Sequence, residues 1–231
     1  YVTDPDFMAD DPATFLTDAA LHAIADDVDR TAAAPWPEKT PSGDTVWLSA
    51  ADGEGRMVSF IQSIYWEFGS GTVLDETGIT WQNRGTSFSL DASHHNHLRP
   101  HRRPFHTIQP ALAQLGDGRV MAYGTMGGEG QPQTQAMVFS RHVLHGQELQ
   151  RAVTAPRWLL GRTWGAETAN LRIESRFDPA VIDRLRAAGH DLEVIGQFDE
   201  VMGHAGAIVR HPDGRMEGAA DPRGDGCVAA F

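Results

Sequence analysis

Residues 41–63 read PSGDTVWLSAADGEGRMVSFIQS, which is a polar turn followed by two strand-like runs. The first run begins at Thr45, and a tight DGEG turn joins it to the second. Apolar and β-branched residues on both sides of such a turn predict an antiparallel hairpin. A threonine at a strand start has an ordinary explanation, because threonine favours strands. Its chemical explanation is that Thr45 is a nucleophile that becomes an N-terminus when the chain is cut before it.

The composition narrows the class of protein. The chain has 231 residues, of which 41% are hydrophobic and 22% charged, as expected for one sizeable globular domain or two small ones. A net charge of −12 argues against a general nucleic-acid binder, which needs a basic surface. The single cysteine, Cys227, excludes an intramolecular disulfide and a metal site built from cysteines alone.

The sequence says little about the cellular compartment of the protein. No apolar run approaches the roughly 20 residues that span a bilayer, so no membrane span is expected, and no signal peptide is visible. The chain begins at Tyr1 rather than Met, so we expect the natural start upstream. The compartment stays open, with the cytoplasm slightly favoured over the periplasm or secretion.

The rest of the sequence alternates hairpin-like strands with separate helical blocks. Residues 1–30 predict an acidic helical segment capped by Asp11 or Thr14, and residues 31–44 a proline-rich linker. The later predictions are strands within 67–85, 107–128 and 204–221, a polar loop at 91–106, and helices around 133–153 and 179–189. This order favours an antiparallel α+β layered domain over a parallel sheet.

Thr45 has no His–Asp pair close to it in the sequence that would activate its hydroxyl. Cleavage of the Asp44–Thr45 bond would instead free an α-amine, whose reference pKa of about 7.7–8.0 lets it act as a base near neutral pH. Nucleophile and base would then belong to one residue. Thr40 is the competing nucleophile, but Pro41 directly after it would break the strand that should follow.

Two other stretches have both a structural and a functional interpretation. Gly127-Gly128, in GTMGGEGQPQ, is a strand-to-helix turn that needs positive φ, or an oxyanion hole made of backbone N–H groups. The loop at 91–106 invites a metal interpretation, but its spacing matches no metal-binding template, so a solvated loop is favoured. Its histidines are His94, His95, His97, His101 and His106.

Arginines and aromatic residues gather near these stretches. Arg99, Arg102 and Arg103 could hold a carboxylate, although surface arginines are the commoner case. The aromatic residues are expected in the core, with the wall of a small-molecule pocket as the functional alternative. They are Tyr65, Trp66, Phe68, Trp81 and Phe88.

An ordered set of motifs carries a resemblance to a known family. The motifs are DPDF at 4–7, GDTVWLSAADGEGRMVS at 43–59, FGSGTVLDETGITWQNRGTSFS at 68–89, RRPFHTIQPAL at 102–112, YGTMGG at 123–128, APRW at 155–158 and GAADPRG at 218–224. Over nearly its whole length the chain resembles the C-terminal part of the gamma-glutamyltransferase (gamma-glutamyl transpeptidase) family of N-terminal-nucleophile hydrolases. An ordered set of motifs is far more specific than any one of them.

The resemblance implies an α+β fold, the four-layer αββα sandwich of that superfamily, and a role in glutathione metabolism. Family members are proenzymes that cut themselves immediately before a threonine, which here matches Thr45. Residues 1–44 would be the end of the large subunit and the linker before the cleavage site, and residues 45–231 the small catalytic subunit. The main partner would be the large-subunit region N-terminal to this chain.

The resemblance also implies roles for other residues. Gly127 and Gly128 match the oxyanion-hole glycines of the family, and Ser63 falls where the family has a hydroxyl residue in contact with the nucleophile. The substrate would be a small-molecule amide, resolved through an acyl-enzyme by water or an acceptor amine. No cofactor and no metal are implied.

The chain departs from the family at the substrate positions. Where gamma-glutamyl-specific members hold the substrate's α-amino group, it has Tyr65, Arg84 and Ser87, and where they hold the α-carboxylate, it has His106-Thr107. An ammonium group facing Arg84 would be repelled. These departures argue against glutathione specificity and suggest a divergent member, similar to the family's cephalosporin-acylase or oxamate-amidohydrolase relatives, in which Arg84, His106 and Thr107 meet an acidic acyl group.

The function expected from these residues is a threonine-nucleophile amidohydrolase or acyltransferase that cleaves a small acyl or gamma-glutamyl-type amide. The alternative is an unprocessed, non-catalytic homologue that binds a small molecule. A metal enzyme that uses the histidine loop ranks last.

Overall fold

The computed structural model describes residues 3–34, 44–161 and 170–231. Its first unit is the predicted hairpin, in which β1 (Asp44–Ala51) pairs antiparallel with β2 (Met57–Tyr65). The turn between them is fixed by Asp52, whose carboxylate accepts hydrogen bonds from the backbone N–H groups of Glu54 and Arg56. The hairpin prediction from residues 41–63 is confirmed.

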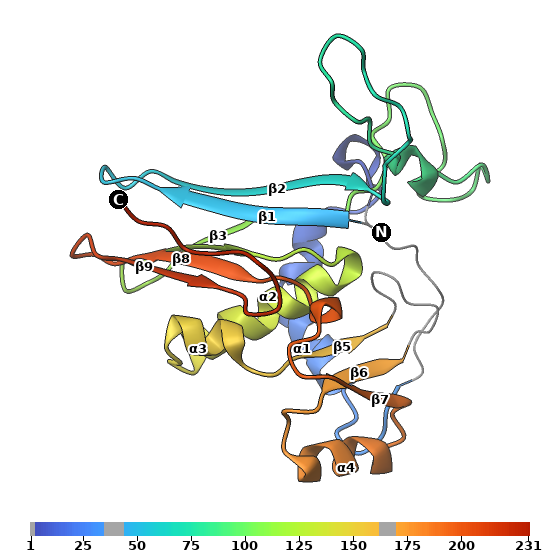
Figure 1. Cartoon of the computed structure of the whole chain (residues 1–231). Coiled ribbons are helices and arrows are strands. Elements are labelled where there is room, and N and C mark those ends of the chain that lie inside the picture. Colours follow the sequence, from blue (N-terminus) through green and yellow to red (C-terminus); the bar gives the residue numbers. More distant parts are fainter. Residues whose placement is uncertain (1–2, 35–43, 162–169) are drawn as a thin grey trace.

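A second sheet lies against this hairpin (Figure 1). It contains β3 (Ala111–Gln114), β4 (Val120–Gly124), β8 (Gly206–Arg210) and β9 (Met216–Ala220) in the order β3-β4-β8-β9. All its pairings are antiparallel, as predicted for residues 107–128 and 204–221.

Two glycines let the sheets approach each other. A Cβ atom at Gly124 or Gly206 would lie 2.1 or 2.4 Å from the Trp47 ring, which is too close for any real contact. Trp47 comes from β1, and its indole N–H donates to Ser59 Oγ on β2. The ring is therefore clamped between the two sheets, and it fixes the position of the strand that begins with Thr45.

Helices cover the far side of the second sheet. α2 (Gln131–Phe139) continues into a π-helical turn, η5 (Ser140–Leu144), and α3 (Leu149–Thr154) follows it. Their apolar side chains and those of the sheet form the buried core, which includes Met121, Val138, Leu149, Val153, Ala205, Ala207, Val209 and Ala219. The prediction of one helix around 133–153 is wrong, because the chain leaves the helical path at 145–148. Glu148 caps the new helix by accepting from the N–H groups of Gln150 and Arg151.

A third, smaller sheet lies beside the core, and its strand pairing differs from the pairing that the sequence favoured. It contains β5 (Trp158–Leu160), β6 (Leu171–Glu174) and β7 (Leu192–Ile195), and β6 and β7 run parallel. The antiparallel pairing that the sequence favoured therefore does not extend to β6 and β7. α4 (Pro179–Ala187) supplies the crossover that parallel strands need. This helix was predicted, and Asp178 caps it as expected by accepting from Ala180 N–H.

The remaining segments are mostly irregular. The predicted helical segment 1–30 contains η1 (Pro5–Phe7), η2 (Pro12–Leu16) and only one α-helix, α1 (Asp18–Asp26). Asp11 caps η2, but the cap of α1 is Thr17 rather than Thr14. The strands expected within 67–85 reduce to one isolated bridge, Val73 with Thr80. Three short 3-10 turns complete the elements: η3 (Arg84–Ser87), η4 (Gly128–Gly130) and η6 (Glu200–Met202). Most of the predicted linker lies outside the described residues.

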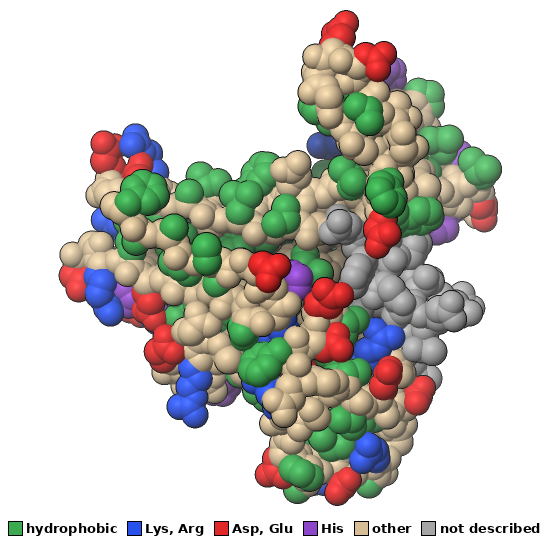
Figure 2. Space-filling view, in the orientation of Figure 1, with side chains coloured by type: hydrophobic (Ala, Val, Ile, Leu, Met, Phe, Trp, Pro, Cys, Tyr) green, Lys and Arg blue, Asp and Glu red, His purple; other side chains and the backbone are tan. Residues whose placement is uncertain are grey.

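The outer face of the β1–β2 hairpin is apolar and exposed (Figure 2). Side chains at alternate positions point away from the second sheet: Val46, Leu48, Val58 and Phe60. In the part of the chain described here, the molecule thus shows a helix layer and two sheet layers, and the outer sheet lacks a cover. No helix in the described ranges has the length and apolar character needed to cross a membrane.

Candidate active site

The hairpin brings Thr45 next to Ser63. The two residues are paired across β1 and β2, and their side-chain oxygens lie 3.0 Å apart in a hydrogen bond. The register shifts between Asp44 and Thr45, because Asp44 pairs with Tyr65 rather than with Ile64. Such irregularities re-aim a side chain at a strand end. Thr45 is only 9% exposed, so its hydroxyl is held inside the molecule, at the edge of the space between the two sheets.

Ser63 connects Thr45 to a buried cation. Its Oγ also accepts a hydrogen bond of 2.8 Å from Arg84 Nη2 and one of 3.1 Å from the Tyr65 backbone N–H. Arg84 therefore lies two hydrogen bonds away from Thr45 Oγ1. A positive charge at that distance favours the negative charge that develops on a hydroxyl oxygen during nucleophilic attack. The sequence placed Ser63 and Arg84 in the site but did not reveal this link between them.

Arg84 is enclosed by aromatic and hydroxyl groups. Its guanidinium carbon lies 4.7 Å from the centre of the Tyr65 ring, and its Nη1 donates to Thr107 Oγ1 over 3.3 Å. Only 1% of the residue is exposed, and burial lowers the pKa of its guanidinium. Tyr65 has a φ of 79°, which is rare for a bulky residue and indicates local strain at this point of the site.

The other predicted substrate residues lie around Arg84. His106 and Arg84 line one cavity of about 360 Å³, together with Gln82, Pro104, Arg103 and the segment Thr3–Pro5. His106 is an exposed residue as a whole, yet partial burial of its ring and the neighbouring charge of Arg84 lower its pKa to about 4. Ser87 shares the η3 turn with Arg84, and its buried Oγ has no hydrogen-bond partner among the described residues.

The glycine corner has the predicted backbone geometry. Gly127 and Gly128 have φ values of 117° and 52°, and they connect β4 to η4 and α2. Gly130 N–H donates to the Gly127 carbonyl, which closes the turn. Met126, immediately before this corner, lines the same cavity as Thr45. The corner is thus close to the candidate nucleophile, although its role as an oxyanion hole stays a prediction.

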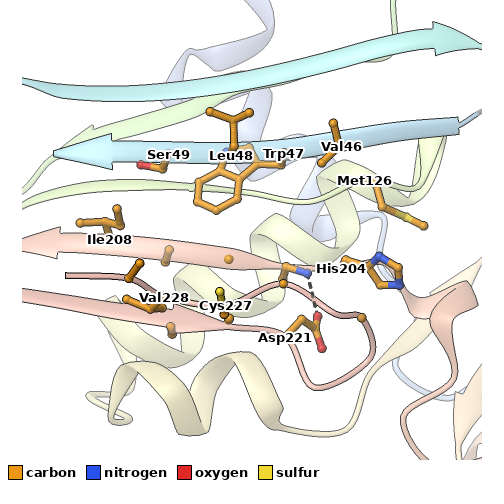
Figure 3. Close-up of a pocket in the computed structure, with 18 of the residues that line it drawn as sticks. Val46, Trp47, Leu48, Ser49, Met126, His204, Ile208, Asp221, Cys227 and Val228 are labelled. Carbon is orange, nitrogen blue, oxygen red and sulfur yellow. Dashed lines mark hydrogen bonds between the residues drawn. The ribbon is translucent and has the colours of Figure 1, made fainter. Parts of the chain in front are cut away.

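The cavity that Thr45 and Met126 line lies between the β1–β2 hairpin and the four-stranded sheet (Figure 3). It has a volume of about 300 Å³, and the Trp47 ring points into it while Leu48 points away. Sequence reasoning missed His204, whose Nε2 is buried without a partner in the described part of the chain, and the tail residues Cys227 and Val228 that line the cavity. Only their place in the fold, beside β8 and β9, brings them there.

Asp221 also lines this cavity, but its contacts are structural. It accepts from Ala205 N–H and forms ion pairs of 2.5 Å with Arg157 and 2.9 Å with Arg223. Arg223 pairs in turn with Glu174 over 2.7 Å. The motifs APRW and GAADPRG therefore supply a buried ion network that ties α3, β6 and the tail together.

In the polar loop at 91–106, two of the arginines considered as carboxylate ligands contact the N-terminal segment. Arg103 binds the carboxylate of Asp4 over 2.7 Å, and Arg102 donates to Thr3 Oγ1. The carboxylate that Arg103 holds thus belongs to the protein's own DPDF motif. Within residues 3–34, 44–161 and 170–231, no three His, Cys, Asp or Glu side chains are grouped so that they could hold a metal ion.

Comparison with known proteins identifies similar chains. A family model described as gamma-glutamyltranspeptidase matches residues 1–231. The chain is 56% identical, over its whole length, to the oxamate amidohydrolase proenzyme of Klebsiella pneumoniae, and 45% identical to the glutathione hydrolase-like YwrD proenzyme of Bacillus subtilis. It covers 44% of each of these relatives, so it spans less than half of their length.

A solved structure shows the same fold. The cephalosporin acylase from Bacillus halodurans superimposes with a TM-score of 0.82 and 35% identity, over 100% of this chain and 41% of the acylase. This similarity confirms the predicted α+β fold of the N-terminal-nucleophile hydrolase type.

Proposed function

This chain belongs to the gamma-glutamyltranspeptidase family, and from that premise we propose that it is the nucleophile-bearing part of a self-cleaving amidohydrolase. The nucleophile is Thr45. One observation carries this assignment: the Thr45 hydroxyl is enclosed at an irregular strand start, hydrogen-bonded to Ser63 and two hydrogen bonds from a buried arginine. A threonine with only a structural role in a strand would not need that arrangement.

Processing follows from the position of the hydroxyl. Thr45 Oγ attacks the carbonyl carbon of Asp44, and the Asp44–Thr45 C–N bond breaks while the hydroxyl proton passes to the departing nitrogen, which leaves an ester at Oγ and a free α-amine on Thr45. Water then hydrolyses the ester. The products are a chain that ends in the Asp44 carboxylate and a chain that begins with Thr45.

Turnover reuses the same two groups. The neutral α-amine of Thr45 takes the hydroxyl proton while Oγ attacks the amide carbonyl of the substrate. The N–H groups at the Gly127-Gly128 corner stabilise the oxyanion of the tetrahedral intermediate. The C–N bond breaks as the α-amine returns its proton to the leaving nitrogen. Water or an acceptor amine then releases the acyl group from Thr45.

The N-terminal region of the whole protein completes the molecule. The chain spans less than half the length of its relatives, and the apolar outer face of β1–β2 is uncovered in the described part. We assign this face to the region that precedes the chain, which would supply the fourth layer of the sandwich. Residues 1–44 then end the large subunit, and residues 45–231 form the small one.

The substrate is a small acyl amide rather than glutathione. Arg84 is buried where a gamma-glutamyl group would place its ammonium, and like charges there disfavour binding. The Klebsiella relative is named for oxamate, so oxamate is the first substrate to assay for the present protein.

The decisive experiment is an intact-mass spectrum of the purified full-length protein, with N-terminal sequencing of the smaller fragment. We expect a fragment that begins TVWLSAAD, and a single uncut chain without amidase activity in Thr45→Ala. Thr40→Ala is the matched control and should be cut normally. A wild-type chain that stays uncut for days at neutral pH would overturn the proposal and favour a non-catalytic binding protein.

A further inference from the structure

The N-terminal segment, residues 3–34, contacts the rest of the chain at both of its ends. At its start, the DPDF motif meets the polar loop at 91–106. Near its end, the Ala33 N–H donates to the Ala188 carbonyl, just after α4, over 2.8 Å. Between these contacts, α1 has no buried residue. The hold on the segment therefore comes from its ends rather than from a packed helix.

The contact at the start of the segment is centred on a buried carboxylate. Asp4 is only 3% exposed, and its carboxylate accepts three hydrogen bonds from Arg103. The donors are the backbone N–H over 2.8 Å, Nε over 3.1 Å and Nη2 over 2.7 Å. These bonds lower the pKa of the Asp4 carboxyl, so it is ionised at neutral pH. A buried carboxylate is stable only with such partners, so the position of Asp4 depends on the loop.

Two further arginines of the loop grip the same segment. The guanidinium carbons of Arg102 and Arg99 lie 4.9 and 5.8 Å from the centre of the Phe7 ring, within the range of cation–π contacts. Arg102 also donates to Thr3 Oγ1 over 2.6 Å and to the His97 carbonyl over 2.9 Å. The same side chain thus binds the segment and braces the loop that receives it.

The two surfaces have complementary charge. Residues 3–30 contain eight aspartates and one arginine, whereas residues 91–106 contain three arginines and one aspartate. Complementary charge of this kind favours one partner and one orientation over others. In a chain with a net charge of −12, the loop is a local basic surface that faces an acidic segment.

We propose that the polar loop at 91–106 is a docking surface for the acidic end of the large subunit, and that it holds residues 3–34 in place after the Asp44–Thr45 bond is cut. The inference rests on the proposed function, since only cleavage turns these contacts into a subunit interface. The pair of Asp4 with Arg103 is its main contact. Thr3 and Asp4 also line the cavity around Arg84. Docking therefore keeps residues of the large subunit in the wall of that cavity.

The first test compares the protein before and after cleavage. Hydrogen exchange, read by mass spectrometry, is measured for a peptide covering residues 3–8 in processed full-length protein and in uncut Thr45→Ala. The Phe7 N–H donates to the Asp4 carbonyl over 2.8 Å, so its exchange reports local opening of this segment. We expect the two rates to agree within about twofold. Loss of protection in the processed protein would refute the docking.

The second test assigns the hold to the ion pair. In the processed protein, Asp4→Asn should speed exchange of the 3–8 peptide about tenfold, the effect of one charged hydrogen bond. Arg103→Gln should speed it less, about threefold or more, because part of the arginine faces water. The double variant should exchange no more than about twofold faster than Asp4→Asn alone, since both changes remove one contact. Effects that multiply in full would show that the two residues act separately and would refute the pair as the main contact.

The matched control removes a charge without removing the contact. Asp10 is an exposed aspartate of the same segment, whose ion pairs in the described residues involve Asp4 and Asp6 instead. Asp10→Asn should leave the exchange of the 3–8 peptide unchanged. An effect equal to that of Asp4→Asn would mean that overall charge, and not the built contact, holds the segment.

Failure of the docking and failure of the proposed function are distinguishable. The intact-mass spectrum reports cleavage, and hydrogen exchange reports docking. A cut protein with an unprotected 3–8 peptide would refute the docking and leave the proposed function intact. A wild-type chain that stays uncut would refute the proposed function and, with it, the subunit interface. Equal exchange in wild type and Asp4→Asn would refute the contact itself, whether or not the chain is cut.

Discussion

At the scale of single residues, Thr45 stands out because one residue is proposed to supply both nucleophile and base. The side chains around Thr45 are consistent with this dual role. Ser63 and Arg84 contribute hydrogen bonding and positive charge, and none of the groups hydrogen-bonded to Thr45 in the described residues is a histidine or a carboxylate. This fits the proposal that cleavage supplies the base, and we expect the activity to titrate as an α-amine.

This yields a prediction about pH dependence. The kcat/KM of the processed enzyme should rise about tenfold per pH unit up to the pKa of the Thr45 α-amine, near 7.7–8.0 in the absence of neighbours. His106 should add no limb of its own, because its lowered pKa of about 4 leaves it neutral across this range. Profiles for wild type and His106→Gln should have the same shape between about pH 5 and 9. A limb near 6.5 that disappears in His106→Gln would contradict this.

The sequence allowed prediction of some of these residues and not of others. Thr45, Ser63 and the Gly127-Gly128 corner could be predicted because their motifs are local and occur in a fixed order. The bond between Arg103 and Asp4 could not, since it joins residues 99 positions apart and depends on how the N-terminal segment packs. The buried hydrogen bond between Arg84 and Ser63 likewise joins residues that are distant in the sequence, so only the folded structure reveals it.

At the scale of elements, the site depends on how closely the hairpin sits on the second sheet. Trp47 lies two residues after Thr45 and is clamped against Gly124 and Gly206. Any side chain at either glycine must push the ring, and with it β1, away from β4 and β8. The small residues in the second sheet thus help to position the nucleophile in the first.

We therefore predict that Gly206→Ala destabilises the protein by about 1–3 kcal/mol, the usual cost of overpacking, and slows self-cleavage. Gly116→Ala, in a turn where an added Cβ has open space, should have little effect. Urea unfolding of the full-length proteins measures the free energies. The cost of Gly206→Ala should shrink in a Trp47→Leu background, because the clashing ring is gone. A cost that is the same in both backgrounds would show that Trp47 is not the obstacle.

Helices and strands were predicted well where local sequence patterns determine them, and poorly where contacts between distant residues determine them. The hairpin and α4 follow from turn and capping residues. The break after α2 depends on Glu148, whose capping role is hidden inside a helical pattern. The parallel pairing of β6 with β7 depends on the crossover through α4, which no alternation pattern reveals.

At the scale of the whole molecule, the two faces of the β1–β2 hairpin differ in their surroundings. The inner face carries Thr45 and Ser63 and packs on the second sheet. The outer face carries large apolar side chains that are about half exposed, which is unusual for a sheet that faces water on one side. The partial coverage of its relatives and this uncovered face both support the proposal that the N-terminal region of the whole protein covers the hairpin.

A charge on the outer face of the hairpin tests whether the N-terminal region covers it. Leu48 is 46% exposed on the outer face, and Leu48→Glu would place a charge without a counter-charge in the contact with the N-terminal region, at a cost of several kcal/mol. We expect the cleaved halves of this variant to separate or precipitate during size-exclusion chromatography, whereas the wild-type halves elute together. Leu144→Glu is the matched control, since Leu144 is 69% exposed on the η5 turn, away from the hairpin, and its halves should stay together. Co-elution of the halves in Leu48→Glu would mean that the outer face is open to solvent in the assembled protein, and the N-terminal region would then have to bind elsewhere.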